Sequence, residues 1–173
     1  MSSAVLVIDM VRGFMEPGYN LYLGERGRSI ISDVVKLLEG EGAHGSKILY
    51  LCDNHDSDDL EFKIFGRHCV SGTRETEIIP ELAKFPGEYI PKKRYSSFYN
   101  TRLDDSLKKI NPDKLIICGV CTEICVCHTA ADARNRDYQT EVVVNCVAPC
   151  YEEAHQYALE HMDKVLGVKL VTV

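Results

Sequence analysis

Hydrophobic residues occur along this chain in short runs that alternate with segments of helical spacing. The runs predict six strands, at Ala4–Ile8, Lys47–Cys52, Glu88–Pro91, Lys114–Cys118, Glu141–Asn145 and Val168–Val173. The segments between them predict helices over Ser29–Glu39, Leu103–Lys109, Ile124–Asp137 and Glu152–Val165, the first of them ending at Gly40. Apolar strands alternating with helices are typical of a mostly parallel sheet covered by helices on both faces, so we predict an α/β protein.

Length and charge narrow the class of protein. The length of 173 residues suits a single domain over residues 1–173, without internal repeats, linkers or low-complexity segments. A formal net charge of −6 at pH 7 argues against a nucleic-acid-binding protein, which would normally present a basic face. No apolar run approaches the length of a membrane span, and the N-terminal residues read as a strand rather than as a signal peptide. We therefore expect a cytoplasmic protein that binds neither nucleic acids nor membranes.

The eight cysteines are expected to be reduced, because several follow apolar strands where a thiol behaves as a small hydrophobic group. Cytosolic proteins rarely keep structural disulfides, which supports the same expectation. Four of the thiols are close in sequence: Cys118, Cys121, Cys125 and Cys127. They lack the paired C-x-x-C arrangement of a structural zinc site and are divided by a strand-to-helix turn, so we do not favour a metal site there.

Reactive side chains follow four of the predicted strands. Asp9 and Asp53 come directly after the first two, Lys92 follows the third, and Cys125 follows the fourth. Ligands of open α/β sheets bind outside the carboxyl ends of the strands. We therefore expect these four side chains to meet at one edge of the sheet.

Cys125 falls in the first turn of the helix predicted over Ile124–Asp137. The positive end of the helix macrodipole and the unpaired backbone N–H groups there favour the thiolate, which is the nucleophilic form. The same N–H groups can hold an oxyanion beside the sulfur. This arrangement suits acyl transfer by a cysteine.

The segment around Cys125 reads ICGVCTEICVCHTAADA and fits the pattern Gly-Val-x-Thr-x-x-Cys-Val at Gly119, Val120, Thr122, Cys125 and Val126. This pattern closely resembles the signature of the isochorismatase-like cysteine hydrolases, the family that contains the nicotinamidases. The resemblance runs from Val5 to about Leu170, nearly the whole chain. It implies the isochorismatase-like hydrolase fold and makes Cys125 the nucleophile.

The resemblance also implies roles for two other strand-end residues. Asp9 corresponds to the family's general base and acid, which takes the Cys125 proton before the thiolate attacks an amide carbonyl and forms a thioester. Lys92 corresponds to the lysine of a K-x-x-[YF]-S-x-F motif, because counting back four residues from Ser96 leads to Lys92 rather than Lys93. A lysine beside Asp9 and Cys125 is expected to lower the pKa of both.

The resemblance places the oxyanion hole at the backbone N–H groups of Cys121 and Cys125, with a cis peptide bond before Cys121. Cys127 is an alternative nucleophile, although it lies past the first helical turn and outside the family pattern. His128 could form a Cys–His dyad with Cys125. However, Asp9 already supplies a base, and a helix histidine more often faces the core or an interface.

A second set of polar residues begins where the second strand ends. Asp53 and His55 form a D-x-H pair, and Glu61 and His68 follow in the same loop. Two imidazoles and two carboxylates suit Zn²⁺, Fe²⁺ or Mn²⁺. Other acidic residues are alternative ligands that we rank lower: Asp56, Asp58 and Asp59.

Nicotinamidases carry a D-x-H pair followed by a His-Cys-Val-x-Gly-Thr stretch, which this chain matches from His68 to Thr73. Many members place a third histidine between them, which is absent here, but a subset has a glutamate seven residues before the last histidine, where Glu61 stands. The resemblance therefore implies one divalent metal ion, with zinc favoured over iron or manganese, that binds the pyridine nitrogen. Aromatic residues at matching positions would wall the ring or serve only as loop anchors: Phe14, Phe65 and Tyr95.

The leading hypothesis from these motifs is a nicotinamidase of NAD salvage, which converts nicotinamide and water to nicotinate and ammonia and forms homo-oligomers by family habit. A second hypothesis keeps the cysteine chemistry but changes the substrate to another small amide, a carbamoyl compound or isochorismate. A third is a non-catalytic thiol or redox module, suggested by the cysteine count. A flavodoxin-like nucleotide binder ranks last, because DMVRGF stands where a glycine-rich phosphate loop would follow the first strand.

Overall fold

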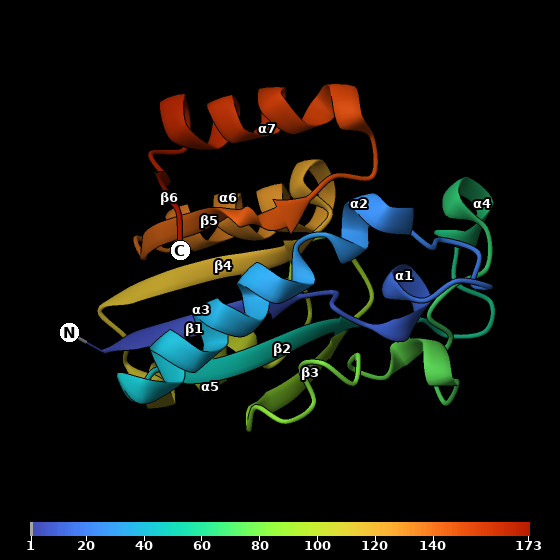
Figure 1. The fold of residues 1–173 in the computed structure, drawn as a ribbon, viewed down its shortest axis with the longest axis horizontal. Coiled ribbons are helices and arrows are strands. Elements are labelled where there is room, and N and C mark those ends of the chain that lie inside the picture. The colour runs from blue at the N-terminus through green and yellow to red at the C-terminus, as the bar shows by residue number, and fades with distance from the viewer. Residues whose placement is uncertain (1) are drawn as a thin grey trace.

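The computed structural model describes residues 2–173 and contains one sheet with the strand order β3-β2-β1-β4-β5-β6 (Figure 1). The strands are β1 (Ser3–Ile8), β2 (Lys47–Asp53), β3 (Glu88–Lys92), β4 (Lys114–Val120), β5 (Gln139–Ala148) and β6 (Lys169–Val171). Every neighbouring pair is parallel, which confirms the α/β prediction and all six strands. The strand order reverses between β1 and β4, so the switch point of the sheet lies beside the end of β1.

Helices cover both faces of the sheet. Helix α3 (Ile31–Ala43) covers one face, and three helices cover the other: α5 (Leu103–Ile110), α6 (Cys127–Arg134) and α7 (Glu152–Lys164). Successive residues of β1 alternate between the two cores, because side chains of a strand point to opposite faces. Val5 and Val7 pack on the α3 side, whereas Leu6 and Ile8 pack on the other.

Helix α3 runs on through Gly40 to Ala43, so the predicted stop at Gly40 is wrong. A glycine inside a helix costs only about 1 kcal/mol, which the buried face of α3 outweighs. Short helical segments carry too few residues for a periodic pattern and were not predicted: α1 (Arg12–Met15), α2 (Gly24–Arg28), α4 (Phe62–Phe65) and η1 (Arg74–Thr76). Helices α1, α2 and α4 gather at the carboxyl end of the sheet (Figure 1). Among residues 2–173, no helix has both the length and the apolar character needed to cross a membrane.

The connection between β4 and α6 differs from the single helix predicted over Ile124–Asp137. It begins with a π-helical turn, η2 (Thr122–Val126), in which the N–H of Val126 donates to the carbonyl of Cys121 at 3.1 Å. The α-helix α6 starts only at Cys127, so Cys125 lies in the wider turn that precedes it. The peptide bond between Val120 and Cys121 is cis, as expected.

Candidate active site

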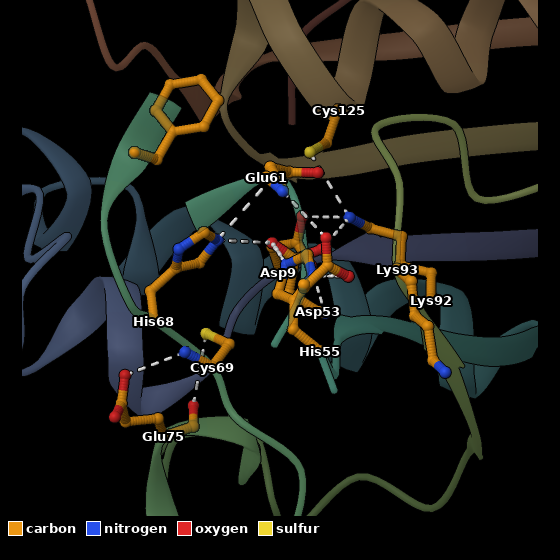
Figure 2. Close-up of polar contacts among 12 residues, drawn as sticks. Asp9, Asp53, His55, Glu61, His68, Cys69, Glu75, Lys92, Lys93 and Cys125 are labelled. Atoms are coloured by element: carbon orange, nitrogen blue, oxygen red, sulfur yellow. Dashed lines mark hydrogen bonds and ion pairs between the residues drawn. The ribbon is translucent and has the colours of Figure 1, made fainter. Parts of the chain in front are cut away.

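The four strand-end side chains meet at the carboxyl edge of the sheet, as the sequence predicted (Figure 2). Lys92 Nζ lies 2.9 Å from Asp9 Oδ2 and 3.4 Å from Cys125 Sγ, and it also pairs with Asp53 Oδ1. The backbone N–H of Asp53 donates to Asp9 Oδ1 at 2.8 Å. All four residues are buried, so one ammonium group serves two carboxylates and a thiol away from water.

Backbone geometry holds Asp9 and the turn around Cys125 in place. Asp9 has a left-handed φ of 53°, and its N–H donates to the carbonyl of Leu51 at 2.8 Å. Gly119, at the end of β4, has a φ of 112°, and a Cβ at this position would lie 2.0 Å from the carbonyl oxygen of Ile8. Only glycine allows β4 to approach β1 this closely, and this approach brings Cys125 to Asp9.

Lys92 lowers the pKa of both reacting groups, as expected, but burial and the neighbouring carboxylates outweigh it. Burial and the charge of Asp53 raise the pKa of Asp9 to about 7, although Lys92 acts in the opposite direction. Burial likewise raises the pKa of the Cys125 thiol well above its usual range despite the nearby ammonium. For Asp53, burial is outweighed by the charge of Lys92 and by the nearby imidazole of His55, which lower its pKa. The raised pKa favours the thiol form of Cys125, and Asp9, with a pKa of about 7, is suited to accept its proton near neutral pH.

The alternative catalytic residues lie elsewhere. Lys93 is half exposed and pairs with Asp56 at 2.6 Å. His128 is exposed and its Nδ1 lies 2.7 Å from the carbonyl oxygen of Ile124 in the preceding π-helical turn, so it forms no dyad with Cys125. Cys127 does not line the cavity beside Cys125.

The second polar group surrounds the end of β2 and the loop after it. Asp53 Oδ2 lies 3.5 Å from His55 Nε2 and 3.8 Å from His68 Nε2, and Glu61 Oε1 lies 3.9 Å from His68 Nε2. One donor atom from each of the four residues lies within 4.8 Å of all the others. His55 Nε2 is buried and has no hydrogen-bond partner within the described part of the chain. Two imidazoles and two carboxylates around an unpartnered nitrogen fit a divalent metal ion.

The other predicted metal ligands do not join this group. Asp56 is 61% exposed and pairs with Lys93, and Asp58 is also exposed. Asp59 has a side chain that is only 3% exposed, but it contacts His55 at Nδ1, the ring nitrogen opposite the one that faces Asp53. The eight cysteines are all free thiols, and the four near Cys125 form no metal-binding cluster of their own in the region described.

A cavity of about 210 Å³ separates the two polar groups. Asp9 and Cys125 line one side, Glu61 and His68 line another, and Asp53 contacts both. A protein cavity of ~150 Å³ is large enough to hold benzene, so this one has room for a substituted aromatic ring.

The three predicted aromatic residues, Phe14, Phe65 and Tyr95, all line this cavity. The sequence missed the rest of the wall, which includes Leu21, Leu23, Arg26 and Cys150. Leu21, Leu23 and Arg26 lie in a segment without hydrophobic periodicity, so no pattern pointed to them.

Comparison with known proteins defines the class. A family model described as the isochorismatase domain matches residues 3–172, so this chain belongs to the isochorismatase family and is a hydrolase at that level. It is similar to a solved pyrazinamidase/nicotinamidase from Streptococcus mutans, with 33% identity, a TM-score of 0.92, and coverage of 98% of this chain and 99% of that one. A pyrazinamidase from Pyrococcus horikoshii in complex with zinc is 31% identical, with a TM-score of 0.91 and 99% of both chains covered. N-carbamoylsarcosine amidase from Thermoplasma acidophilum is 30% identical, with a TM-score of 0.90 and coverage of 99% and 96%.

Proposed function

We propose that this protein is a metal-dependent nicotinamidase that hydrolyses nicotinamide to nicotinate and ammonia. One observation carries the proposal: a single cavity is lined by Cys125 and by three of the four metal-type ligands, Asp53, Glu61 and His68. A pyridine carboxamide needs both, because its amide carbon must reach a nucleophile while its ring nitrogen reaches an electrophile. Similarity to the enzymes from S. mutans and P. horikoshii supports the same substrate class.

Asp53, His55, Glu61 and His68 would hold the metal, for which we propose zinc. When bound, the metal supplies a Lewis-acidic position for the pyridine nitrogen. Phe65 and Tyr95 lie edge to face with ring centroids 6.3 Å apart, and with Phe14 they would enclose the ring. The amide group is then directed toward Cys125.

The residues of the strand ends carry the covalent steps. Asp9 takes the proton of Cys125, and the thiolate attacks the amide carbon to give a tetrahedral intermediate. The backbone N–H groups of Cys121 and Cys125 would hold its oxyanion. The C–N bond breaks as Asp9 returns the proton to the departing ammonia. Asp9 then removes a proton from water, and the resulting hydroxide attacks the thioester carbon. As the C–S bond breaks, Asp9 returns the proton to the Cys125 sulfur, and the released acid ionises to nicotinate.

Lys92 has two effects in this scheme, both electrostatic. Its ammonium lies 2.9 Å from Asp9 Oδ2 and 3.4 Å from Cys125 Sγ, so it orients the carboxylate and favours the thiolate as it forms. Asp9 and Asp53 in turn hold its pKa above the usual range, although burial opposes them. Lys92 therefore remains charged and gives up no proton during turnover.

A second candidate function keeps this chemistry on another small amide or carbamoyl compound. Arg26 favours it, because this half-exposed guanidinium lines the cavity and could bind a substrate carboxylate. Similarity to the T. acidophilum amidase points the same way.

Ammonia release from nicotinamide tests the proposal. We compare wild type, Cys125→Ala, and wild type stripped by a chelator and reloaded with Zn²⁺, with Cys127→Ala as the matched control outside the cavity. We expect turnover to be lost in Cys125→Ala and in the stripped enzyme, restored by Zn²⁺, and retained in Cys127→Ala. No ammonia release by zinc-loaded wild type, together with turnover of a carboxylate-bearing amide, would favour the second candidate.

A further inference from the structure

Asp59 lies in the loop that carries the proposed metal ligands, yet it points away from the cavity and its side chain is only 3% exposed. Its Oδ2 lies 3.1 Å from His55 Nδ1. Its Oδ1 accepts a hydrogen bond from the backbone N–H of Glu61 at 2.9 Å. One buried carboxylate therefore contacts the side chain of one proposed ligand and the backbone of another.

Arg94 completes the surroundings of Asp59. Its Nη1 donates to both carboxylate oxygens, at 3.1 and 3.0 Å. Its carbonyl oxygen in turn accepts a hydrogen bond from Lys92 Nζ at 3.3 Å. Arg94 thus links the ligand loop to the strand end that carries the catalytic lysine. Each oxygen of Asp59 already has two polar partners, so this carboxylate is not available as a metal ligand.

The contact at Nδ1 decides which nitrogen of His55 can bind a metal. A carboxylate at Nδ1 requires a proton on that nitrogen, so His55 donates from Nδ1 and keeps its lone pair on Nε2. Nε2 is buried, has no hydrogen-bond partner among residues 2–173, and faces Asp53. Asp59 therefore fixes both the tautomer and the direction of this imidazole.

We propose that Asp59 is a positioning residue for the metal centre, which orients His55 and Glu61 and is itself held by Arg94. This inference rests on the metal site of the proposed function. Asp56 provides the contrast, because it belongs to the same loop but is 61% exposed and pairs with Lys93 rather than with a proposed metal ligand. Removal of one negative charge from the loop can therefore be separated from removal of the contact with His55.

Zinc affinity, measured by competition with a chromophoric chelator, tests the inference on the full chain. In Asp59→Asn the side chain keeps its size and shape, but an NH₂ group replaces one carboxylate oxygen. That NH₂ group would face two hydrogen-bond donors and could accept from neither. We expect the Kd for Zn²⁺ to rise ~10–100-fold, the usual effect of losing an outer partner of a metal-bound histidine. Asp56→Asn should bind Zn²⁺ as wild type does. Excess Zn²⁺ should restore amide turnover to Asp59→Asn, because Asp9, Lys92 and Cys125 are untouched.

Arg94→Gln provides a second variant, since its guanidinium is 43% exposed and its loss is tolerable for folding. We expect a severalfold rise in Kd, smaller than that of Asp59→Asn. Thermal unfolding of the metal-free proteins reports whether each variant folds, and if Asp59→Asn does not, Arg94→Gln alone decides. Wild-type affinity in the folded variants, an equal loss in Asp56→Asn, or turnover that excess Zn²⁺ does not restore would overturn the role of Asp59. Failure of wild type itself to bind Zn²⁺ would instead overturn the metal site.

Discussion

The two sides of the cavity are built differently. The strand-end group (Asp9, Lys92 and Cys125) is fixed by the sheet, because Asp9 and Lys92 lie at or directly after strand ends and Cys125 lies in the π-helical turn that follows β4. The loop group (His55, Glu61 and His68) lies on the connection after β2 and around the short helix α4. Leu60 and Ile64 are 67% and 72% exposed, so little apolar burial holds the part of this connection around α4.

In the proposed function, this difference separates the residues that carry the covalent steps from those that position the substrate. Proton transfer and nucleophilic attack tolerate little displacement, which suits side chains set by strand ladders. The loop group depends on polar contacts, and a set of ligands on such a loop can change without disturbing the sheet. Asp53 belongs to both sides, because Oδ1 pairs with Lys92 while Oδ2 faces the two imidazoles.

Substitution of the two aspartates gives the largest expected effects and tests this division. Asp9→Asn removes the proposed base, so kcat should fall ~10²–10⁴-fold while the affinity for Zn²⁺ stays near that of wild type. Asp53→Asn should lower both kcat and zinc affinity, because its carboxylate serves both groups. Ammonia release and chelator competition measure the two quantities. A zinc affinity that falls equally in both variants would remove the distinction between the two sides.

Two glycines with positive φ allow the tightness of backbone packing to be compared between the two sides of the cavity. A Cβ at Gly119 would meet the backbone of Ile8 at 2.0 Å, whereas a Cβ at Gly72, in the ligand loop, would have no atom within 4 Å. Gly119→Ala should therefore lower the free energy of unfolding by about 3 kcal/mol or more, from strain plus overpacking. Gly72→Ala should cost only about 1–2 kcal/mol, from the left-handed backbone alone. Urea unfolding measures both values, and equal losses would show that the sheet edge is no tighter than the loop.

Glu61→Gln is expected to weaken metal binding by the loop group without changing the strand-end group. Glu61 lies 3.9 Å from His68 and does not contact Cys125 or Lys92, so the affinity for Zn²⁺ and KM should change more than kcat at saturating zinc. The loss of affinity should be at least the ~10–100-fold typical for an outer-sphere partner. Steady-state kinetics over a range of Zn²⁺ concentrations measure the separation. A fall in kcat that zinc does not restore would place Glu61 in the covalent chemistry instead.

The strand-end group could be predicted from the sequence more fully than the loop group. Asp9, Asp53, Lys92 and Cys125 were predictable, because the carboxyl ends of parallel strands share an edge once the strands are recognised. The pKa directions of Asp9 and Cys125 were not, because they depend on how one buried ammonium is shared. The pKa values depend on the distances from the Lys92 ammonium to its neighbours, and spacing along the chain does not give these distances.

The loop side was less predictable. The stretch Asp56–Asp59 offers several carboxylates of equal appearance, and only the contact with Arg94 and His55 distinguishes Asp59 from the exposed Asp56. The π-helical turn around Cys125 was also missed, since its residues have the same pattern as the first turn of an α-helix.

The smallest expected effect concerns two thiols that face the same cavity, Cys125 and Cys150. The hydrogen bond with Cys121 lowers the pKa of Cys150 to about 7, whereas burial raises the pKa of Cys125. Cys150 should therefore react with iodoacetamide before Cys125 at pH 7, at a rate that rises with pH and levels off about one unit above that pKa. Peptide mass spectrometry from pH 5 to 9 follows both thiols, and Cys121→Ala should move the midpoint of Cys150 upward. Faster modification of Cys125 at pH 7 would mean that Asp9 and Lys92 already hold it as a thiolate, and the strand-end group would then rest one proton-transfer step further along the reaction.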